Sequence, residues 1–121
     1  MMNRAKKFTV LLLLTSSVTF AQQKNYSQDV QSIDSIIASL YDVISGDPET
    51  DRDWDRFRNL FKPEAKLIPT RKDDSGVFII KPMNPEEYIQ LFSTRISTGF
   101  FERELNRKTE EYGTIAHVFS T

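Results

Sequence analysis

The residues that could carry acid–base chemistry are few in this sequence. His117 is the only histidine, and histidine is the side chain best suited to exchange protons at neutral pH. Its place beside Ile115 and Phe119 on an expected strand leaves two roles open, a group in a ligand pocket or a packed histidine with one hydrogen-bond partner. No second group stands at a defined spacing from His117, so the residues alone predict no catalytic pair.

Metal and cofactor chemistry has less support. Asp51, Asp53 and Asp55 resemble the start of a calcium loop, but Arg56 and Lys62 stand where that loop needs glycine and glutamate. A chain with zero cysteines and one histidine does not build a protein zinc site. The sequence also has no glycine-rich phosphate loop. We expect no metal and no cofactor.

Aromatic residues at helical spacing could line a pocket for an apolar molecule. Trp54, Phe57 and Phe61 share one face of a short expected helix, and such a face serves either a pocket or an ordinary core. Tyr41 and Tyr88 could place a hydroxyl at the edge of that pocket, or pack in the core with the hydroxyl at its rim. The residues predicted to bind a ligand are Tyr41, Trp54, Phe57, Tyr88, Phe92 and His117.

Helices and strands alternate in the pattern of an α+β protein. Apolar residues at three-and-four spacing predict a helix over residues 28–45, with Ser27 as its cap. Asp53 caps the short aromatic helix, and Asn84 with Pro85 begins a third helix that Gly99 ends. The predicted strands are 66–68, 77–81, 100–110 and 114–121, with Gly113 in the last turn.

One face of the predicted strand 100–110 could form an interface with a second copy of the chain. Alternate positions place Phe101, Arg103, Leu105 and Arg107 on that face. Arginines in such a setting could receive a partner's carboxylates. The other interpretation is a solvated face whose arginines lie opposite acidic neighbours.

The first 21 residues have the composition of a signal peptide. Arg4, Lys6 and Lys7 precede an apolar run, and the small residues Thr19 and Ala21 predict cleavage after Ala21. We expect an exported, periplasmic or secreted protein whose single domain spans residues 22–121. Removing three cations changes the formal charge from -1 to -1 - 3 = -4. A mildly acidic domain is not expected to bind nucleic acid or, after cleavage, a membrane.

Three segments resemble the nuclear-transport-factor-2-like (NTF2-like) superfamily, which includes SnoaL-type cyclases and ketosteroid isomerase. They are residues 33–46, 54–69 and 111–121. The resemblance, to an exported bacterial member, implies a cone in which three N-terminal helices pack on a curved, mostly antiparallel sheet around an apolar pocket. Because residues 114–121 still read as a strand where the sequence stops, we expect a domain truncated before its final strands.

The resemblance also bears on catalysis. Ketosteroid isomerase relatives carry an aspartate base just after the corner that corresponds to residues 60–65, but residues 66–70 contain no carboxylate. We therefore expect a domain that binds a small apolar molecule without catalysis. Two alternatives stay open: a SnoaL-like isomerase, cyclase or dehydratase that uses His117 and a tyrosine hydroxyl, or a module that forms homodimers through its sheet.

Overall fold

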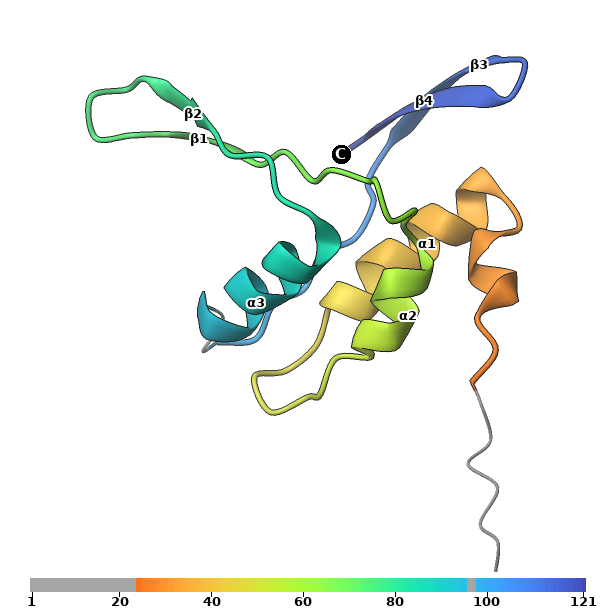
Figure 1. The fold of residues 1–121 in the computed structure, drawn as a ribbon, viewed down its shortest axis with the longest axis horizontal. Helices are drawn as coiled ribbons and strands as arrows, with labels where there is room; N and C mark the ends of the chain where they lie inside the picture. Colours follow the sequence, from red (N-terminus) through yellow and green to blue (C-terminus); the bar gives the residue numbers. More distant parts are fainter. Residues whose placement is uncertain (1–23, 96–97) are drawn as a thin grey trace, which may run out of the picture.

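The described part of the chain has a mixed α+β architecture, with three α-helices beside two projecting β-hairpins (Figure 1). The computed structural model describes residues 24–95 and 98–121, so the expected signal peptide lies outside the described residues. The elements are η1 (Ser27–Val30), α1 (Ile33–Ile44), α2 (Trp54–Asn59), β1 (Thr70–Lys72), β2 (Phe78–Ile80), α3 (Pro85–Arg95), β3 (Arg107–Tyr112) and β4 (Ile115–Ser120).

The first predicted helix divides into two parts. A 3-10 turn occupies Ser27–Val30, and α1 begins only after Ser32, so the prediction of one helix from residue 28 was wrong. Ser32 has an extended backbone, and its side chain accepts a hydrogen bond from the Ser35 amide at 3.0 Å. The Ser35 hydroxyl accepts in turn from the Ser32 amide. This reciprocal capping box starts a helix at that point.

The other two helix starts are confirmed. Asp53 accepts a hydrogen bond from the Arg56 amide at 3.1 Å and caps α2. Asn84 accepts from the Glu87 amide at 2.9 Å, while the Glu87 carboxylate accepts from the Asn84 amide at 2.7 Å. Pro85 is the first residue of α3, where its missing amide hydrogen has no intrahelical role.

The strands differ more from the prediction. Residues 66–68 do not form a strand, because Leu67 makes only an isolated bridge to Met83 and the following Pro69 has no amide hydrogen to extend it. The sequence did not predict β1, which pairs antiparallel with β2. A turn joins them, in which the Asp73 side chain accepts hydrogen bonds from the Ser75 and Val77 amides.

The third predicted strand begins seven residues late. Residues 101–106 have no regular structure, and β3 begins at Arg107. Glu104 forms an ion pair with Arg107, three positions along the chain, and residues three apart in a strand would lie on opposite faces. This contact is incompatible with a regular strand through residues 104–107, and β3 begins only at Arg107. The glycine turn is confirmed, since Gly113 has a φ of 60° between β3 and β4.

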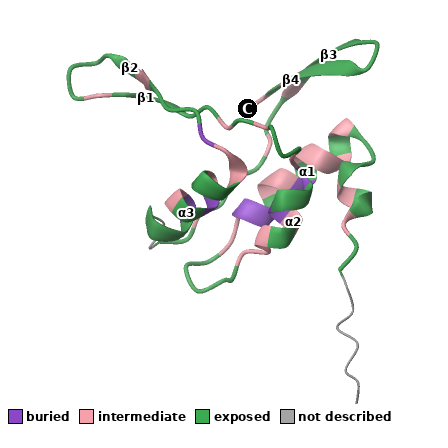
Figure 2. Ribbon diagram, in the orientation of Figure 1, coloured by how far each residue is buried: buried purple, intermediate pink, exposed green. Residues whose placement is uncertain are grey.

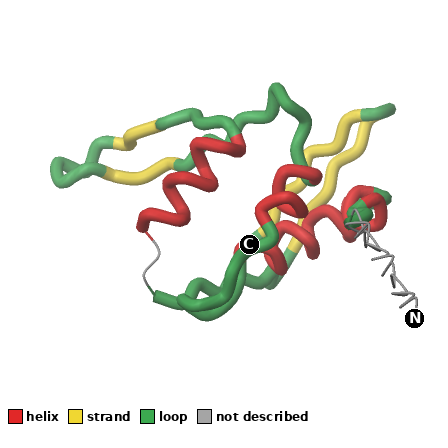
Figure 3. The backbone as a smooth tube through the Cα atoms, turned by 60° about the horizontal axis from the view of Figure 1, so that its bottom comes forward, coloured by secondary structure: helices red, strands yellow, loops and turns green. Residues whose placement is uncertain are grey.

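The two hairpins form two separate two-stranded sheets, not one continuous sheet. They diverge from each other, β1–β2 on the side of α3 and β3–β4 on the side of α1 (Figures 1 and 3). Buried residues lie in the helices and in the segment leading into α3, whereas the hairpins are mostly exposed (Figure 2).

The core is an aromatic cluster at the contact of α1, α2 and α3. Phe57 is fully buried, and its ring stacks on Tyr88 at a centroid distance of 5.2 Å. Trp54 meets Phe57 edge-on at 5.7 Å, and Phe92 edge-on at 5.5 Å. The remaining buried apolar residues of this cluster are Val43, Ile44, Leu60 and Ile89.

Candidate functional site

An apolar pocket opens where α1, α2 and α3 meet the chain segment that follows α2. Its volume is about 440 Å³, within the range of roughly 300–1,000 Å³ that ligand sites usually occupy. We call this hollow the apolar pocket. It is lined by Leu40, Tyr41, Ile44, Phe57, Phe61, Leu67, Ile68, Pro69, Tyr88 and Glu102.

The walls of the apolar pocket are continuous with the hydrophobic core. Phe57 and Ile44 are buried core residues, and Phe61 lies against Phe57 at a centroid distance of 4.8 Å. Because these side chains are fixed by the packing of the helices, the wall is formed before any ligand arrives. Ile68 also lines the pocket but has 55 % of its surface exposed, so it forms part of the open edge.

Tyr41, Tyr88 and Glu102 are the polar residues among those that line the apolar pocket. The two tyrosine hydroxyls differ in their hydrogen bonding. The Tyr41 hydroxyl already has a partner, the Ser120 hydroxyl at 3.0 Å. The Tyr88 hydroxyl has no hydrogen-bond partner among residues 24–95 and 98–121. Burial, and to a lesser degree the negative charge of Glu102, raises the pKa of Tyr88 above its ordinary value.

Tyr41 also connects the apolar pocket to the β3–β4 hairpin. Ser120 donates a hydrogen bond to Glu104 at 2.7 Å, and Glu104 pairs with Arg107, which contacts Asp34 of α1. The Arg107 guanidinium, with help from the Ser120 hydroxyl, lowers the pKa of Glu104 to about 2. These contacts hold the end of β4 against α1 beside the pocket.

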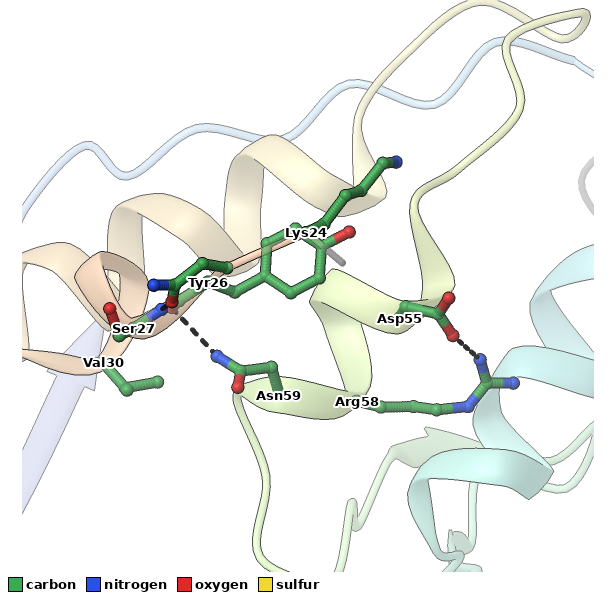
Figure 4. Close-up of a pocket in the computed structure, with 8 residues that line it drawn as sticks. Lys24, Tyr26, Ser27, Val30, Asp55, Arg58 and Asn59 are labelled. Atoms are coloured by element: carbon green, nitrogen blue, oxygen red, sulfur yellow. Dashed lines mark hydrogen bonds and ion pairs between the residues drawn. The ribbon is translucent and has the colours of Figure 1, made fainter. Parts of the chain in front are cut away.

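A second, larger and more polar hollow lies between the N-terminal segment and α2 (Figure 4). Its polar side chains are largely engaged with one another. The Asn59 side chain donates to the Tyr26 carbonyl at 3.1 Å, and Arg58 pairs with Asp55 at 2.8 Å. Lys24 pairs at 2.8 Å with Asp53, the cap of α2. We interpret these contacts as structural: they attach the N-terminal segment to α2.

The structure brings together half of the residues predicted to bind a ligand. Tyr41, Phe57 and Tyr88 line the apolar pocket. Trp54 and Phe92 do not, since they pack against each other in the core and line a shallow polar hollow beside Arg52. That placement agrees with the packing interpretation of these two aromatic residues.

His117 lies away from the apolar pocket. It is exposed on β4, opposite Glu110 of β3. Ser120, three residues further along the same strand, contacts Tyr41 at the pocket. Residues three apart in a strand point to opposite faces, so His117 points away from the face that meets α1. The proposed pairing of His117 with a tyrosine hydroxyl therefore has no geometric support.

The residues predicted to form an interface do not share a strand face. Only Arg107 belongs to a strand, and its side chain is largely buried in ion pairs with Glu104 and Asp34. Phe101 and Leu105 lie in the irregular segment before β3 with 69 % and 74 % of their surfaces exposed. Arg103 lies between them and is exposed.

Several pocket residues were missed by the sequence reasoning. Leu40 and Ile44 lie at the three-and-four spacing that predicts the first helix, and the same face of that helix lines the pocket. Ile68 ends the predicted strand 66–68 and Pro69 follows it, in the segment that resembles the NTF2-like superfamily. That resemblance could have identified both as pocket residues. Glu102 gave no signal, because a single carboxylate in a polar segment is ordinary.

Comparisons with protein-family models, with curated proteins and with solved structures found no match. Within the described part of the chain, no group of three or more acidic, histidine or cysteine side chains could hold a metal ion. No helix in the same residues combines the length and apolar character needed to cross a membrane.

Proposed function

We propose that this chain binds a small, mostly apolar molecule in the apolar pocket and catalyses no reaction on it. The observation that carries the proposal is the lining itself: seven of the ten residues are apolar, two are tyrosines and one is charged. Ligand sites in proteins usually combine a preformed apolar wall with a few polar groups that orient the ligand.

A substitution at the edge of the pocket tests this proposal without disturbing the core. Ile68 lines the pocket yet is 55 % exposed, so Ile68→Asp should leave the fold intact. We expect the dissociation constant for 1-decanol, measured by calorimetry, to rise about five-fold or more, because the variant loses apolar contact and places a charge beside the ligand.

Ile80→Asp is the matched control. Ile80 is 62 % exposed on β2 and does not line the pocket, so the same change there should leave decanol affinity unaltered. Equal losses in the two variants would mean that binding is not located in the apolar pocket. Absence of decanol binding in the unaltered chain would overturn the proposal.

We also propose that the chain adopts the NTF2-like cone architecture. The support is the element order, in which helices precede the final hairpin, and the place of the apolar pocket beside the corner that follows α2. A cone further requires the two hairpins to join in one curved sheet. Nuclear Overhauser contacts between the backbones of the β1–β2 and β3–β4 hairpins would support the proposal, and their absence in an assigned spectrum would contradict it.

Homodimer formation is a second candidate function, and it can coexist with ligand binding. The observation that favours it is the exposure of large apolar side chains around the predicted interface, Phe101 and Leu105 among them. Exposed apolar groups that lie together usually mark a contact with another molecule.

A further inference from the structure

The apolar pocket has one charged lining residue, and its charge is negative. Glu102 lies in the irregular segment that precedes β3, and its backbone is held on Ser45, whose hydroxyl bonds the Glu102 amide at 2.9 Å and the Glu102 carbonyl at 3.1 Å. The Glu102 carboxylate itself forms no ion pair or hydrogen bond with another residue in the described ranges. The backbone is therefore fixed while the charge remains available to a ligand.

Four aromatic residues line the same pocket as Glu102. Tyr41, Phe57, Phe61 and Tyr88 all line the pocket, and Tyr88 is close enough to Glu102 for the carboxylate to influence its ionisation. The face of an aromatic ring carries partial negative charge and attracts cations. An aromatic wall next to a carboxylate without a counter-ion thus favours a positive group on the ligand over a negative one.

We propose that the ligand of the apolar pocket is a cationic amphiphile, an apolar body with an ammonium headgroup that lies between Glu102 and the aromatic wall. This inference rests on the proposed function and adds the charge of the ligand to it. An anionic headgroup would meet Glu102, and the pocket lining contains no lysine or arginine to offset that repulsion. Glu102 is exposed to solvent, so a neutral headgroup would meet no repulsion but would gain no charge pair.

A series of three probes separates the headgroup from the apolar body. Decyltrimethylammonium, 1-decanol and decanoate share a ten-carbon chain and differ in charge. The two ions are titrated below their micelle concentrations and decanol below its solubility limit, all at low ionic strength. We expect the cation to bind about ten-fold more tightly than decanol, from one partly exposed charge pair and one or two cation–π contacts, and decanoate to bind most weakly.

Glu102→Gln assigns the preference to the carboxylate. This variant keeps the size of the side chain and the backbone contacts with Ser45. We expect the ratio of cation affinity to decanol affinity to fall about five-fold. Glu111→Gln is the control, because Glu111 is an exposed carboxylate on β3 that does not line the pocket. The cation preference should persist unchanged in that variant.

The outcomes distinguish this inference from the function on which it rests. Equal affinity for all three probes, or tightest binding of decanoate, would overturn the cationic ligand while leaving an apolar binding site in place. A cation preference that survives Glu102→Gln would overturn the assigned site of the headgroup. No binding of any probe would overturn both proposals. The headgroup series on the unaltered chain is informative even if the variant folds poorly.

Discussion

Asp53 joins three parts of the N-terminal half of the molecule through a single carboxylate. It accepts hydrogen bonds from the Lys24 ammonium at 2.8 Å, from the Tyr26 hydroxyl at 2.8 Å and from the Arg56 amide at 3.1 Å. These contacts, the Lys24 ammonium first, lower the pKa of Asp53 to about 2. The sequence predicted its capping role, but Lys24 and Tyr26 are 29 and 27 residues away in the chain and gave no signal.

We expect Asp53→Ala to lower the free energy of unfolding by about 1 kcal/mol at pH 7, the usual effect of removing a helix cap. Urea denaturation followed by far-UV circular dichroism measures the change. Asp51→Ala is the control, because Asp51 is exposed and lies just outside the helix. A loss of equal size in Asp51→Ala would show that the effect comes from general charge and not from the cap.

The contribution of Asp53 to the free energy of unfolding should decrease as the pH falls. Its pKa in the folded chain is about 2, below the ordinary value of about 4 in an unfolded chain. The carboxylate therefore stabilises the fold fully above about pH 4, and this contribution is lost as the pH falls toward 2. We expect the stability difference between the unaltered chain and Asp53→Ala to shrink across that interval. A difference that stays constant from pH 7 to pH 2 would contradict the assigned ion pair.

At the scale of elements, Arg56 connects α2 to both preceding helices. Its guanidinium pairs with Asp29 of η1 at 2.7 Å and contacts Asp42 of α1, and it reaches the buried Ser39 hydroxyl at 3.3 Å. The Asp29 side chain is only 16 % exposed. A charge in that position needs its partner, because water cannot replace the lost contact fully.

Arg56→Met should therefore destabilise the chain by about 2 kcal/mol, since it leaves Asp29 largely buried without its cation. Arg58→Met is a matched control on the same helix. Arg58 is 43 % exposed and pairs with the exposed Asp55 and Glu86, so we expect a loss below about 1 kcal/mol. Denaturant midpoints measure both changes, and equal losses would show that Arg56 does not act as the connection between the helices.

Local sequence determined helix starts better than it determined strands. The caps at Asp53 and Asn84 depend on side chains within three residues of the helix start, so the pattern alone was sufficient. Ser32 and Ser35 form a cap of the same kind inside a continuous apolar pattern, where the periodicity of the apolar residues obscured it. Pairing in β1–β2 and the contact of Glu104 with Ser120 depend on residues elsewhere in the chain, which a short window of sequence does not contain.

In the candidate site too, residues placed by local sequence could be predicted, and those placed by distant contacts could not. Tyr41, Phe57 and Tyr88 could be predicted because helical spacing places them on buried faces that meet. The orientation of His117 could not, because the direction of a strand face depends on which side of the hairpin meets α1. That side is set by the contact of Ser120 with Tyr41, 79 residues apart in the chain.

At the scale of the whole molecule, the hairpins and the segment before β3 carry apolar side chains that the helical core does not cover. The large apolar residues with more than half of their surface exposed in these regions are Val77, Phe78, Ile80, Phe101, Leu105, Tyr112, Ile115 and Phe119. Isolated two-stranded hairpins are only marginally stable in water. Association with a second copy would cover part of this surface and support the hairpins.

Arg103→Glu tests association at the predicted interface. Arg103 lies between the exposed Phe101 and Leu105, so reversing its charge should oppose the approach of a second, acidic copy. Without residues 1–21 the charge changes from -4 to -4 - 2 = -6 per chain. We expect sedimentation to show a shift from dimer toward monomer, with the dimer dissociation constant raised about ten-fold or more.

Arg71→Glu separates a specific interface from general charge repulsion. Arg71 is exposed on β1, in the hairpin that points away from β3–β4, and the same substitution there gives the same net charge (Figure 1). A dimer lost only in Arg103→Glu would place the interface at Phe101 and Leu105. Equal loss in both variants would mean that net charge controls association, and a monomer in the unaltered chain would overturn the dimer. Because Glu102 of the apolar pocket is adjacent to Arg103, a dimer formed there would also bring the second copy to the edge of the ligand site.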